Sequence, residues 1–450
     1  MVVSLMIAWP CVPRDSDEWS PPGNEECDLS LRRYPLSRAL FSVGVLSCVL
    51  IVELASLYGA AAAPGRGEHM SRDTSPPSVR PAAARGALIW ARPFNTSAAL
   101  PSAARNYRVL YHSRRPDDTD VTVSGTVAIP SGNPPAAGWP LITWTHGTTG
   151  LALRCAPSND TLDGPEHRYL SITQAMLDAF VKRGYVVVAT DYQGIGVAGT
   201  PAYLVGSGEG RSAIDIMRAA RKIDLAIGTR YVVMGHSQGG HADLFTAAIG
   251  PDYAPEFTLL GNVAMAPASH IGELVREVVI GSHPSPILPF VTYVLQSYAA
   301  YYPEIILERI LTPQAIGHLR DTWEGCIDEA LASGYWADSI PSRQFVTQPD
   351  LGLLLKATAA NEPGQLRIAA PTLLIQGTSD RTIPPQATDA VARDLCRVGN
   401  SVSYRTYFDA SHEGVLTVAK ADIEAWVDAR FAGVKATSNC NEPPSAKASR

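Results

Sequence analysis

Short runs of β-branched and aliphatic residues recur along the chain from residue 121 onward, and this pattern constrains the fold more than any other feature. Continuous apolar runs of about four to eight residues are typical of strands that are buried on both faces, as in a parallel sheet. The alternation of valine, glycine and isoleucine on one face predicts a strand at residues 121–130. The apolar runs predict strands at residues 141–145, 185–190, 231–234, 260–266 and 372–376, and a last strand is predicted at residues 402–408.

Helical patterns lie between these strands. Residues 211–225 place alanine, isoleucine and methionine side chains on one face of a helix, and residues 171–182 and 241–249 follow a similar period. Alternating strands and helices over roughly 300 residues predict an α/β fold, in which helices cover both faces of a mostly parallel central sheet.

The alternation lapses between residues 269 and 362. This stretch is rich in aromatic and aliphatic residues, contains several prolines and shows no clear strand. Helical periodicity in residues 291–311 and near 351–360 favours a helical insertion over a structureless loop of that length. We therefore expect an α/β core, residues 86–268 and 363–436, and a helical insertion, residues 269–362.

Residues 1–85 differ in composition from the rest of the chain. Three arginines precede an apolar run at residues 39–52, and four alanines end the segment at residue 63. A positive flank, a short apolar segment and a small-residue end describe a secretory signal peptide, followed here by a flexible lead-in. The uninterrupted run of about 14 residues is shorter than the roughly 20 needed to span a bilayer. We expect a secreted protein, with the alternative that residues 39–63 anchor it to the outer face of the membrane.

Residues 235–239 read GHSQG and match the pattern G-x-S-x-G. They stand between a predicted strand and a predicted helix, which is the context in which such a serine is presented at a sharp turn. A serine hydroxyl near its free pKa is a poor nucleophile and needs a neighbouring base. Ser237 is therefore the predicted nucleophile, and the rest of the chain must supply a histidine and an acid.

The histidine and the acid are selected by their positions after strands. His412 follows the last predicted strand, at the carboxyl edge of the sheet, where the sites of open α/β folds collect. Asp380 follows the preceding strand, which preserves the order serine, acid, histidine. Asp409 is the rival acid but is close to His412 along the chain, and Asp191 is expected to order its own loop. The predicted triad is Ser237, Asp380 and His412, which acts through an acyl-enzyme.

The tetrahedral intermediate of such a reaction needs backbone N–H donors. One is expected from Gln238, the residue after the nucleophile. The other is expected from the loop after the strand at 141–145, where residues 146–150 read HGTTG, and Thr148 is the predicted donor. The alternative is a glycine-rich loop that only turns the chain.

Charge and cysteine content narrow the class of protein further. The net charge is −6 and no block is rich in lysine and arginine, so the electrostatic footprint of a nucleic-acid-binding protein is absent. Cys155, Cys326, Cys396 and Cys440 follow the leader, and an even number in an exported chain predicts two disulfides in one of three pairings. Buried free thiols are the alternative. No CxxC motif or His/Cys cluster indicates a metal site.

Together these segments resemble the secretory lipase family of α/β hydrolases, which is found in actinobacteria and fungi. The resemblance covers residues 107–427. It rests on HGTTG at 146–150, CAPS at 155–158, DYQG at 191–194, GHSQGG at 235–240, Gln376-Gly377 with Asp380, and His412.

The resemblance implies an α/β-hydrolase fold whose helical insertion is a lid. It also implies acyl-ester substrates that include triacylglycerols, and no cofactor. The partners would be an ester or lipid substrate and, transiently, a lipid interface, while the oligomeric state stays open. In such proteins Cys155 pairs with a lid cysteine, here Cys326, which leaves Cys396 with Cys440.

Two other functions stay open at this point. A carboxylesterase for short or aromatic esters, or a peptidase on the same fold, would use the same residues, because acyl length depends on the shape of the lid. A non-catalytic binding protein would keep the scaffold without the chemistry, and the complete triad with both oxyanion loops argues against it.

Overall fold

The computed structural model describes residues 83–332 and 334–442. They belong to one compact unit of the chain, Ser78–Arg450. The predicted signal peptide and its alternative as an anchor, residues 39–63, lie outside the described residues. Among the residues that are described, no helix is both long enough and apolar enough to cross a membrane.

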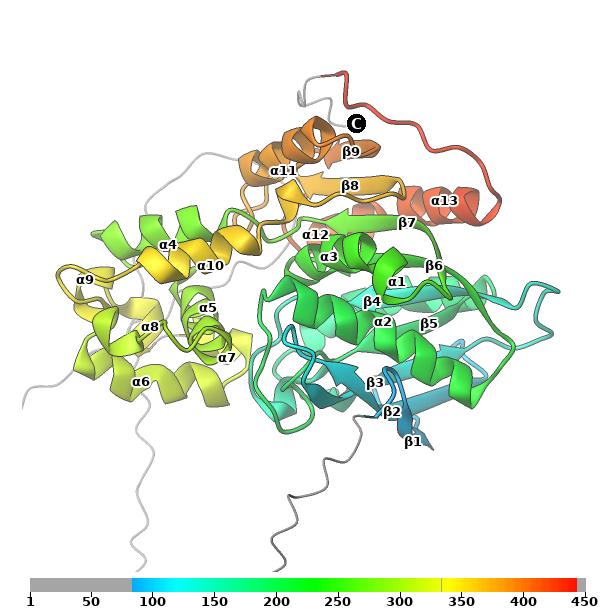
Figure 1. The fold of residues 1–450 in the computed structure, drawn as a ribbon, viewed down its shortest axis with the longest axis horizontal. Helices are drawn as coiled ribbons and strands as arrows, with labels where there is room; N and C mark the ends of the chain where they lie inside the picture. The colour runs from blue at the N-terminus through cyan, green and yellow to red at the C-terminus, as the bar shows by residue number, and fades with distance from the viewer. Residues whose placement is uncertain (1–82, 333, 443–450) are drawn as a thin grey trace, which may run out of the picture. The chain divides into compact units, whose positions relative to one another are not determined.

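A nine-stranded sheet forms the centre of this unit, in the order β1-β2-β3-β5-β4-β6-β7-β8-β9 (Figure 1). The pairs β1–β2, β2–β3 and β3–β5 are antiparallel. All the following pairs in this order, from β5–β4 to β8–β9, are parallel. The strands are β1 (Leu88–Pro93), β2 (Arg105–Arg114), β3 (Asp120–Ile129), β4 (Trp139–Thr145), β5 (Val186–Thr190), β6 (Ile227–His236), β7 (Thr258–Met265), β8 (Thr372–Gly377) and β9 (Val402–Tyr407). The mostly parallel sheet is the predicted one, and each of the seven predicted strands is present.

The structure adds two strands, β1 and β2, that the sequence pattern did not predict. In β2 the buried side chains of Val109, Tyr111 and Ser113 alternate with half-buried polar and aliphatic ones. One face of this antiparallel strand is therefore only partly covered. The continuous apolar run that marked the parallel strands is absent from β2 for this reason.

Two layers of helices cover the sheet, and the strands from β3 to β9 contribute side chains to both. On β4, Leu141 points into one apolar core and Ile142 into the other. The helices α2 (Gly206–Ile223), α3 (Gln238–Tyr253) and α11 (Pro385–Arg397) pack on the first face. The helices α1 (His167–Lys182), α12 (Gly414–Val418) and α13 (Lys420–Phe431) pack on the second.

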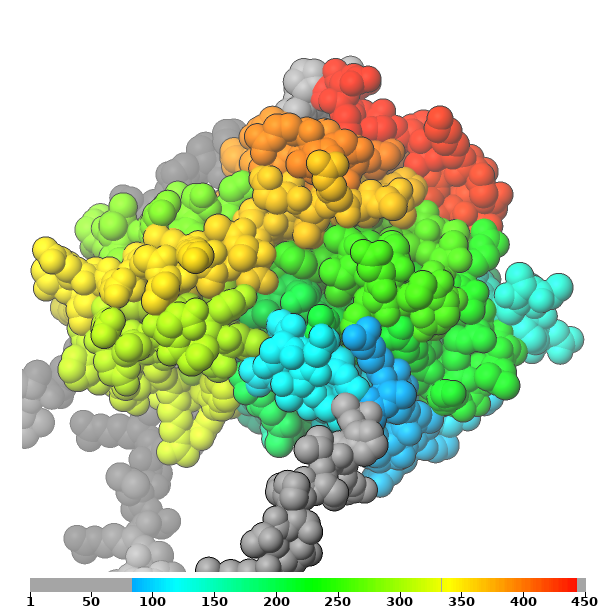
Figure 2. All heavy atoms as spheres, viewed as in Figure 1, coloured from blue at the N-terminus to red at the C-terminus, as the bar shows by residue number. Residues whose placement is uncertain are grey.

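The chain between β7 and β8 is helical, and its apolar core also takes in Leu151 and the residues Ala202–Val205 of the α/β part. The predicted helix at 291–311 ends at Tyr301, two residues before Pro303, because proline cannot continue a helix. Figure 2 shows the segment, yellow-green to yellow, adjoining the rest of the unit. Its helices are α4 (Ile271–Ile280), α5 (Leu288–Tyr301), α6 (Pro313–Glu324), α7 (Ile327–Leu331), α8 (Tyr335–Asp338), α9 (Pro341–Gln344) and α10 (Gly352–Ala360). Short 3₁₀ turns lie at η1 (Leu153–Cys155), η2 (Pro157–Asn159), η3 (Leu307–Arg309) and η4 (Pro363–Gln365).

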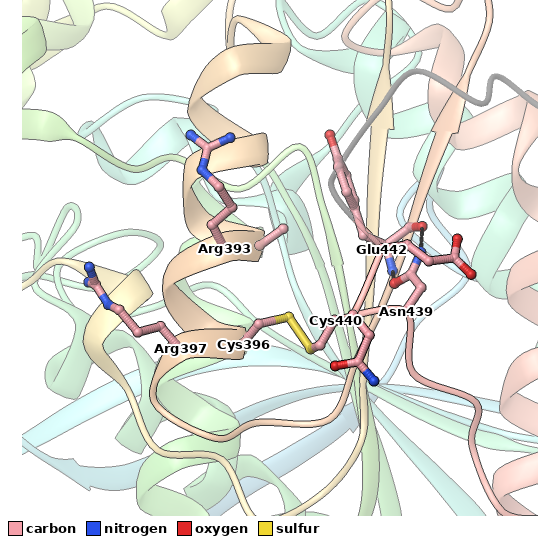
Figure 3. A pocket seen from close by; sticks show the side chains of 9 residues that line it. Arg393, Cys396, Arg397, Asn439, Cys440 and Glu442 are labelled. Carbon is pink, nitrogen blue, oxygen red and sulfur yellow. Dashed lines mark hydrogen bonds between the residues drawn. A yellow bond between two sulfur atoms is a disulfide. The ribbon is translucent and has the colours of Figure 1, made fainter.

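Two disulfides are present, in the pairing that the resemblance implied. Cys155 joins Cys326, which ties the loop after β4 to the residue before α7. Cys396 on α11 joins Cys440 (Figure 3). Next to it, Asn439 exchanges two side-chain hydrogen bonds of 2.8 Å with the backbone of Tyr404, so the C-terminal tail covers the outer edge of β9.

Candidate active site

Ser237 lies at a sharp turn between β6 and α3. Its φ of 59° and ψ of −119° are strained for a residue with a side chain. A Cβ at Gly235 would lie 2.2 Å from Oγ1 of Thr145, and one at Gly239 would lie 1.9 Å from the carbonyl oxygen of Thr145. The two glycines are therefore required because the turn packs directly against the end of β4.

His412 and Asp380 meet at the carboxyl ends of β9 and β8. Nδ1 of His412 lies 2.7 Å from Oδ2 of Asp380, whose carboxylate is fully buried. The other oxygen of Asp380 accepts the backbone N–H groups of Thr382 and Ile383, at 2.9 and 2.8 Å. The carboxylate accepts hydrogen bonds, so the contact favours a proton on Nδ1 of His412, and in the neutral ring Nε2 then has the lone pair. This is the tautomer that a base for a serine hydroxyl needs.

Ser237 and His412 line the same pocket, which has a volume of about 140 Å³. Phe290 on α5 and Ile327 and Leu331 on α7 bring the helical segment to its wall. The remaining lining residues are Gly147, Thr148, Glu166, Arg168, Tyr169, His236, Asp328, Thr382 and Glu413.

The rival acid Asp409 faces elsewhere. Its side chain is exposed and accepts a hydrogen bond of 2.8 Å from Ser379. Asp191 is also away from the pair, but its role differs from the predicted ordering of its own loop. Its carboxylate accepts the hydroxyl groups of Ser124 and Ser158, both at 2.6 Å, and so fixes the segment after Cys155 to the sheet. The sequence analysis missed this role because the two serines come from segments distant in sequence, and no local pattern reveals such contacts.

The two predicted oxyanion donors border the turn. Within the described residues, neither the backbone N–H of Thr148 nor that of Gln238 has a protein acceptor. The side chain of Gln238 donates to the buried Glu209 at 2.6 Å, and the hydroxyl of Thr148 lies 3.0 Å from that of Tyr203. Both side chains are thus held, while both N–H groups stay available for a developing negative charge.

Glu166 is a pocket residue that the sequence analysis did not select. It precedes α1 and accepts the backbone N–H of Asp328 on α7 at 3.0 Å. Burial raises the pKa of Glu166 to about 8; the carboxylates of Asp328 and Glu329 add to the shift, and the Asp328 N–H opposes it. No local pattern marks this acid, because it becomes buried only when α7 packs against it.

Replacing Glu166 with glutamine is expected to raise stability at alkaline pH. The pKa is higher in the folded state than the usual 4.5, so the unfolded state binds fewer protons and stability falls as the pH rises from about 4.5 to about 8. Glutamine keeps the acceptor and removes the charge. Allowing for partial screening by solvent, the gain in free energy of unfolding should be about 2 kcal/mol larger at pH 8 than at pH 5. Urea unfolding at pH 5 and at pH 8 measures this difference. The explanation would be contradicted if Glu166→Gln gained the same free energy of unfolding at both pH values, or if the exposed control Glu304→Gln showed the same dependence on pH.

Among the described residues, no group of three His, Cys, Asp or Glu side chains is placed to hold a metal ion.

The model of the secretory lipase family matches residues 169–439. The chain belongs to the secretory lipase family. This secretory lipase is accordingly a carboxylic-ester hydrolase. It is 27% identical over 354 residues to the secreted triacylglycerol lipase LIP4 of Malassezia globosa, covering 75% of this chain and 74% of that one.

Two further comparisons describe the range of its relatives. The secretory lipase is 22% identical over 362 residues to the probable inactive lipase MT1628 of Mycobacterium tuberculosis, covering 76% of each chain. Its fold is similar to that of Candida antarctica lipase A in the closed state, with a TM-score of 0.68, 20% identity, and coverage of 80% of this chain and 85% of that one. The fold is therefore that of an α/β hydrolase.

Proposed function

We propose that this chain is a secreted triacylglycerol lipase in which Ser237, His412 and Asp380 form the catalytic triad. The observation that carries the proposal is the 2.7 Å contact between His412 and Asp380 beside the pocket that Ser237 also lines. The strained turn at Ser237 supports it, since backbone strain of this kind gathers at functional sites. These features favour an active enzyme over an inactive scaffold.

The proposed reaction has two halves. Oγ of Ser237 attacks the ester carbonyl carbon as Nε2 of His412 takes its proton, and Asp380 stabilises the resulting imidazolium. The N–H groups of Thr148 and Gln238 bind the oxyanion. The C–O bond to the alcohol then breaks, and the alcohol takes the proton from His412. Water attacks the acyl-enzyme with His412 as base, which releases the carboxylic acid and restores Ser237.

Secretion is part of the proposal. It is supported by the signal-like leader in residues 1–85 and by relatives that are named secreted lipases. The N-terminus of protein recovered from the medium should lie after residue 63. A product that stays in the membrane fraction and retains residues 39–63 would favour the anchored alternative.

A short-chain carboxylesterase is the second candidate, and the size of the pocket favours it. A volume of about 140 Å³ is below the roughly 300 Å³ at which ligand pockets begin to enclose a drug-sized molecule. Glu166, Arg168, Asp328 and Glu413 also give the pocket a polar margin. A long acyl chain would need the apolar helical segment, through Phe290 and its neighbours, to make room for it.

Hydrolysis of p-nitrophenyl esters from acetate to palmitate separates the two candidates. A buried methylene is worth about 0.8 kcal/mol, so a lipase should gain up to about fourfold in kcat/KM per methylene until its acyl site is filled. Triolein should be hydrolysed as well. Activity confined to acetate and butyrate would keep the triad and move the function to carboxylesterase. Each rate is corrected by the Ser237→Ala variant.

A further inference from the structure

A line of hydrogen bonds joins the oxyanion loop to the predicted catalytic histidine. The backbone N–H of Gly147 donates to the hydroxyl of Tyr169 at 2.9 Å. That hydroxyl lies 3.1 Å from Nδ1 of His236, and Nε2 of His236 lies 2.9 Å from the backbone carbonyl of His412. Tyr169 and His236 are both buried, on α1 and at the end of β6.

The direction of every hydrogen bond in this line is determined. A carbonyl oxygen can only accept, so Nε2 of His236 carries a proton and donates to His412. Burial, with the neighbouring His412, lowers the pKa of His236 well below its usual value, so the ring is neutral and Nδ1 accepts. Burial also raises the pKa of Tyr169, so its hydroxyl keeps the proton that it donates to Nδ1.

The line connects parts of the site that come from separate segments of the chain. Gly147 precedes Thr148, one of the proposed oxyanion donors, and the ring of His236 lies 4.4 Å from the ring of His412. His236 is also the neighbour of Ser237. One buried imidazole therefore stands between the nucleophile, the base and, through Tyr169, the oxyanion loop.

We propose that Tyr169 and His236 are positioning residues, which hold the backbone of His412 and the Gly147–Thr148 peptide in register with Ser237. The proposal rests on the proposed function. Neither residue needs to touch the reacting atoms. Their effect follows because a displacement of about 1 Å in a catalytic group can cost as much as a hundredfold in rate.

Kinetics of Tyr169→Phe and His236→Phe test the proposal. Each variant removes hydrogen bonds without removing the aromatic ring and leaves buried polar groups unpaired. We expect kcat for a soluble ester to fall about tenfold to a hundredfold, with KM within about twofold of the original. Binding of an alkyl boronic acid, which forms a tetrahedral adduct on the serine, should weaken by the same factor as kcat.

Two matched variants separate positioning from general stability. Tyr185→Phe removes another buried hydroxyl, which donates to Asp428 at 2.6 Å. Because this hydrogen bond lies away from the pocket, the variant should leave kcat unchanged. His236→Gln keeps a side-chain N–H for the carbonyl of His412 and should recover at least a third of the lost rate on a logarithmic scale. Thermal unfolding of all four variants shows whether they fold alike.

A second readout does not depend on turnover. In the Ser237→Ala background, the low-field proton signal of Nδ1–H of His412, bonded to Asp380, should shift when Tyr169→Phe is added. An unchanged signal would overturn the proposal. A kcat within twofold of the original in both Tyr169→Phe and His236→Phe would also overturn it, as would a loss of kcat in Tyr185→Phe equal to theirs. If hydrolysis does not depend on Ser237, the proposed function fails, and the proton signal still decides whether Tyr169 and His236 position His412.

Discussion

Replacing Ser237 with alanine is expected to lower kcat for ester hydrolysis by about 10⁶, with the fold intact. The variant loses the only atom that forms the acyl-enzyme in the proposed reaction. Alanine also has a Cβ, so it meets the same backbone strain at φ 59° as serine does, and the turn should keep its shape. The side chain is nearly buried and leaves no large cavity when the hydroxyl is removed.

The measurement combines turnover with labelling of the serine. Wild-type protein should react with a fluorophosphonate probe and the Ser237→Ala variant should not. Ser411→Ala is the matched control, since this serine precedes His412 and its hydroxyl, among the residues that the structure describes, accepts only the backbone N–H of Gly414 at 3.1 Å. Residual activity within a hundredfold of the original, or labelling that survives in the variant, would rule out Ser237 as the nucleophile.

Replacing Asp380 with asparagine is expected to lower kcat by about 10⁴. An amide in this place can present its NH₂ group to His412, which favours the tautomer with the lone pair on Nδ1 and the proton on Nε2. The base then cannot take the proton of Ser237. Asparagine still has an oxygen for the N–H groups of Thr382 and Ile383, so the loop should hold its conformation.

The control for this variant is Asp409→Asn. Asp409 is nearer to His412 in sequence, but its exposed carboxylate bonds to Ser379. Its replacement should leave kcat within about twofold of the original. The opposite ranking, with the larger loss in Asp409→Asn, would transfer the role of the acid to Asp409. Steady-state kinetics with the same soluble ester compares both.

The core of the α/β fold could be predicted from the sequence because it depends on local rules. Buried parallel strands need continuous apolar runs, and the helices between them need one apolar face. The parallel strands β4 to β8 follow the first rule, and the antiparallel β3 was recognised by its alternating pattern, whereas β1 and β2 are half-covered and escape both patterns. The length of the helix beginning at Leu288 was overestimated, because the apolar pattern continued past Tyr301 although Pro303 ends the helix.

The candidate triad was also within reach of the sequence. In a parallel sheet, residues that follow consecutive strands gather at one edge, so their order along the chain indicates which can meet. Ser237, Asp380 and His412 follow β6, β8 and β9 respectively, and the structure places the last two in contact. The close contacts behind the two glycines of the turn were not visible. Neither glycine has a positive φ; a Cβ at Gly235 would meet the backbone of Gly239 and the side chain of Thr145, and a Cβ at Gly239 would meet the backbone of Thr145.

The sequence by itself determined the sheet, the helical segment and the residues at the ends of strands. These features depend on the pattern of apolar and turn-forming residues within short stretches of the chain. Only the tertiary structure decided what surrounds those residues. Glu166 meets Asp328 across 162 positions, and Tyr169 meets His236 across 67. Burial sets the protonation of Glu166 and His236, and burial is a property of the packed chain. Contacts between distant segments have no local pattern, so they appear only when the chain has folded.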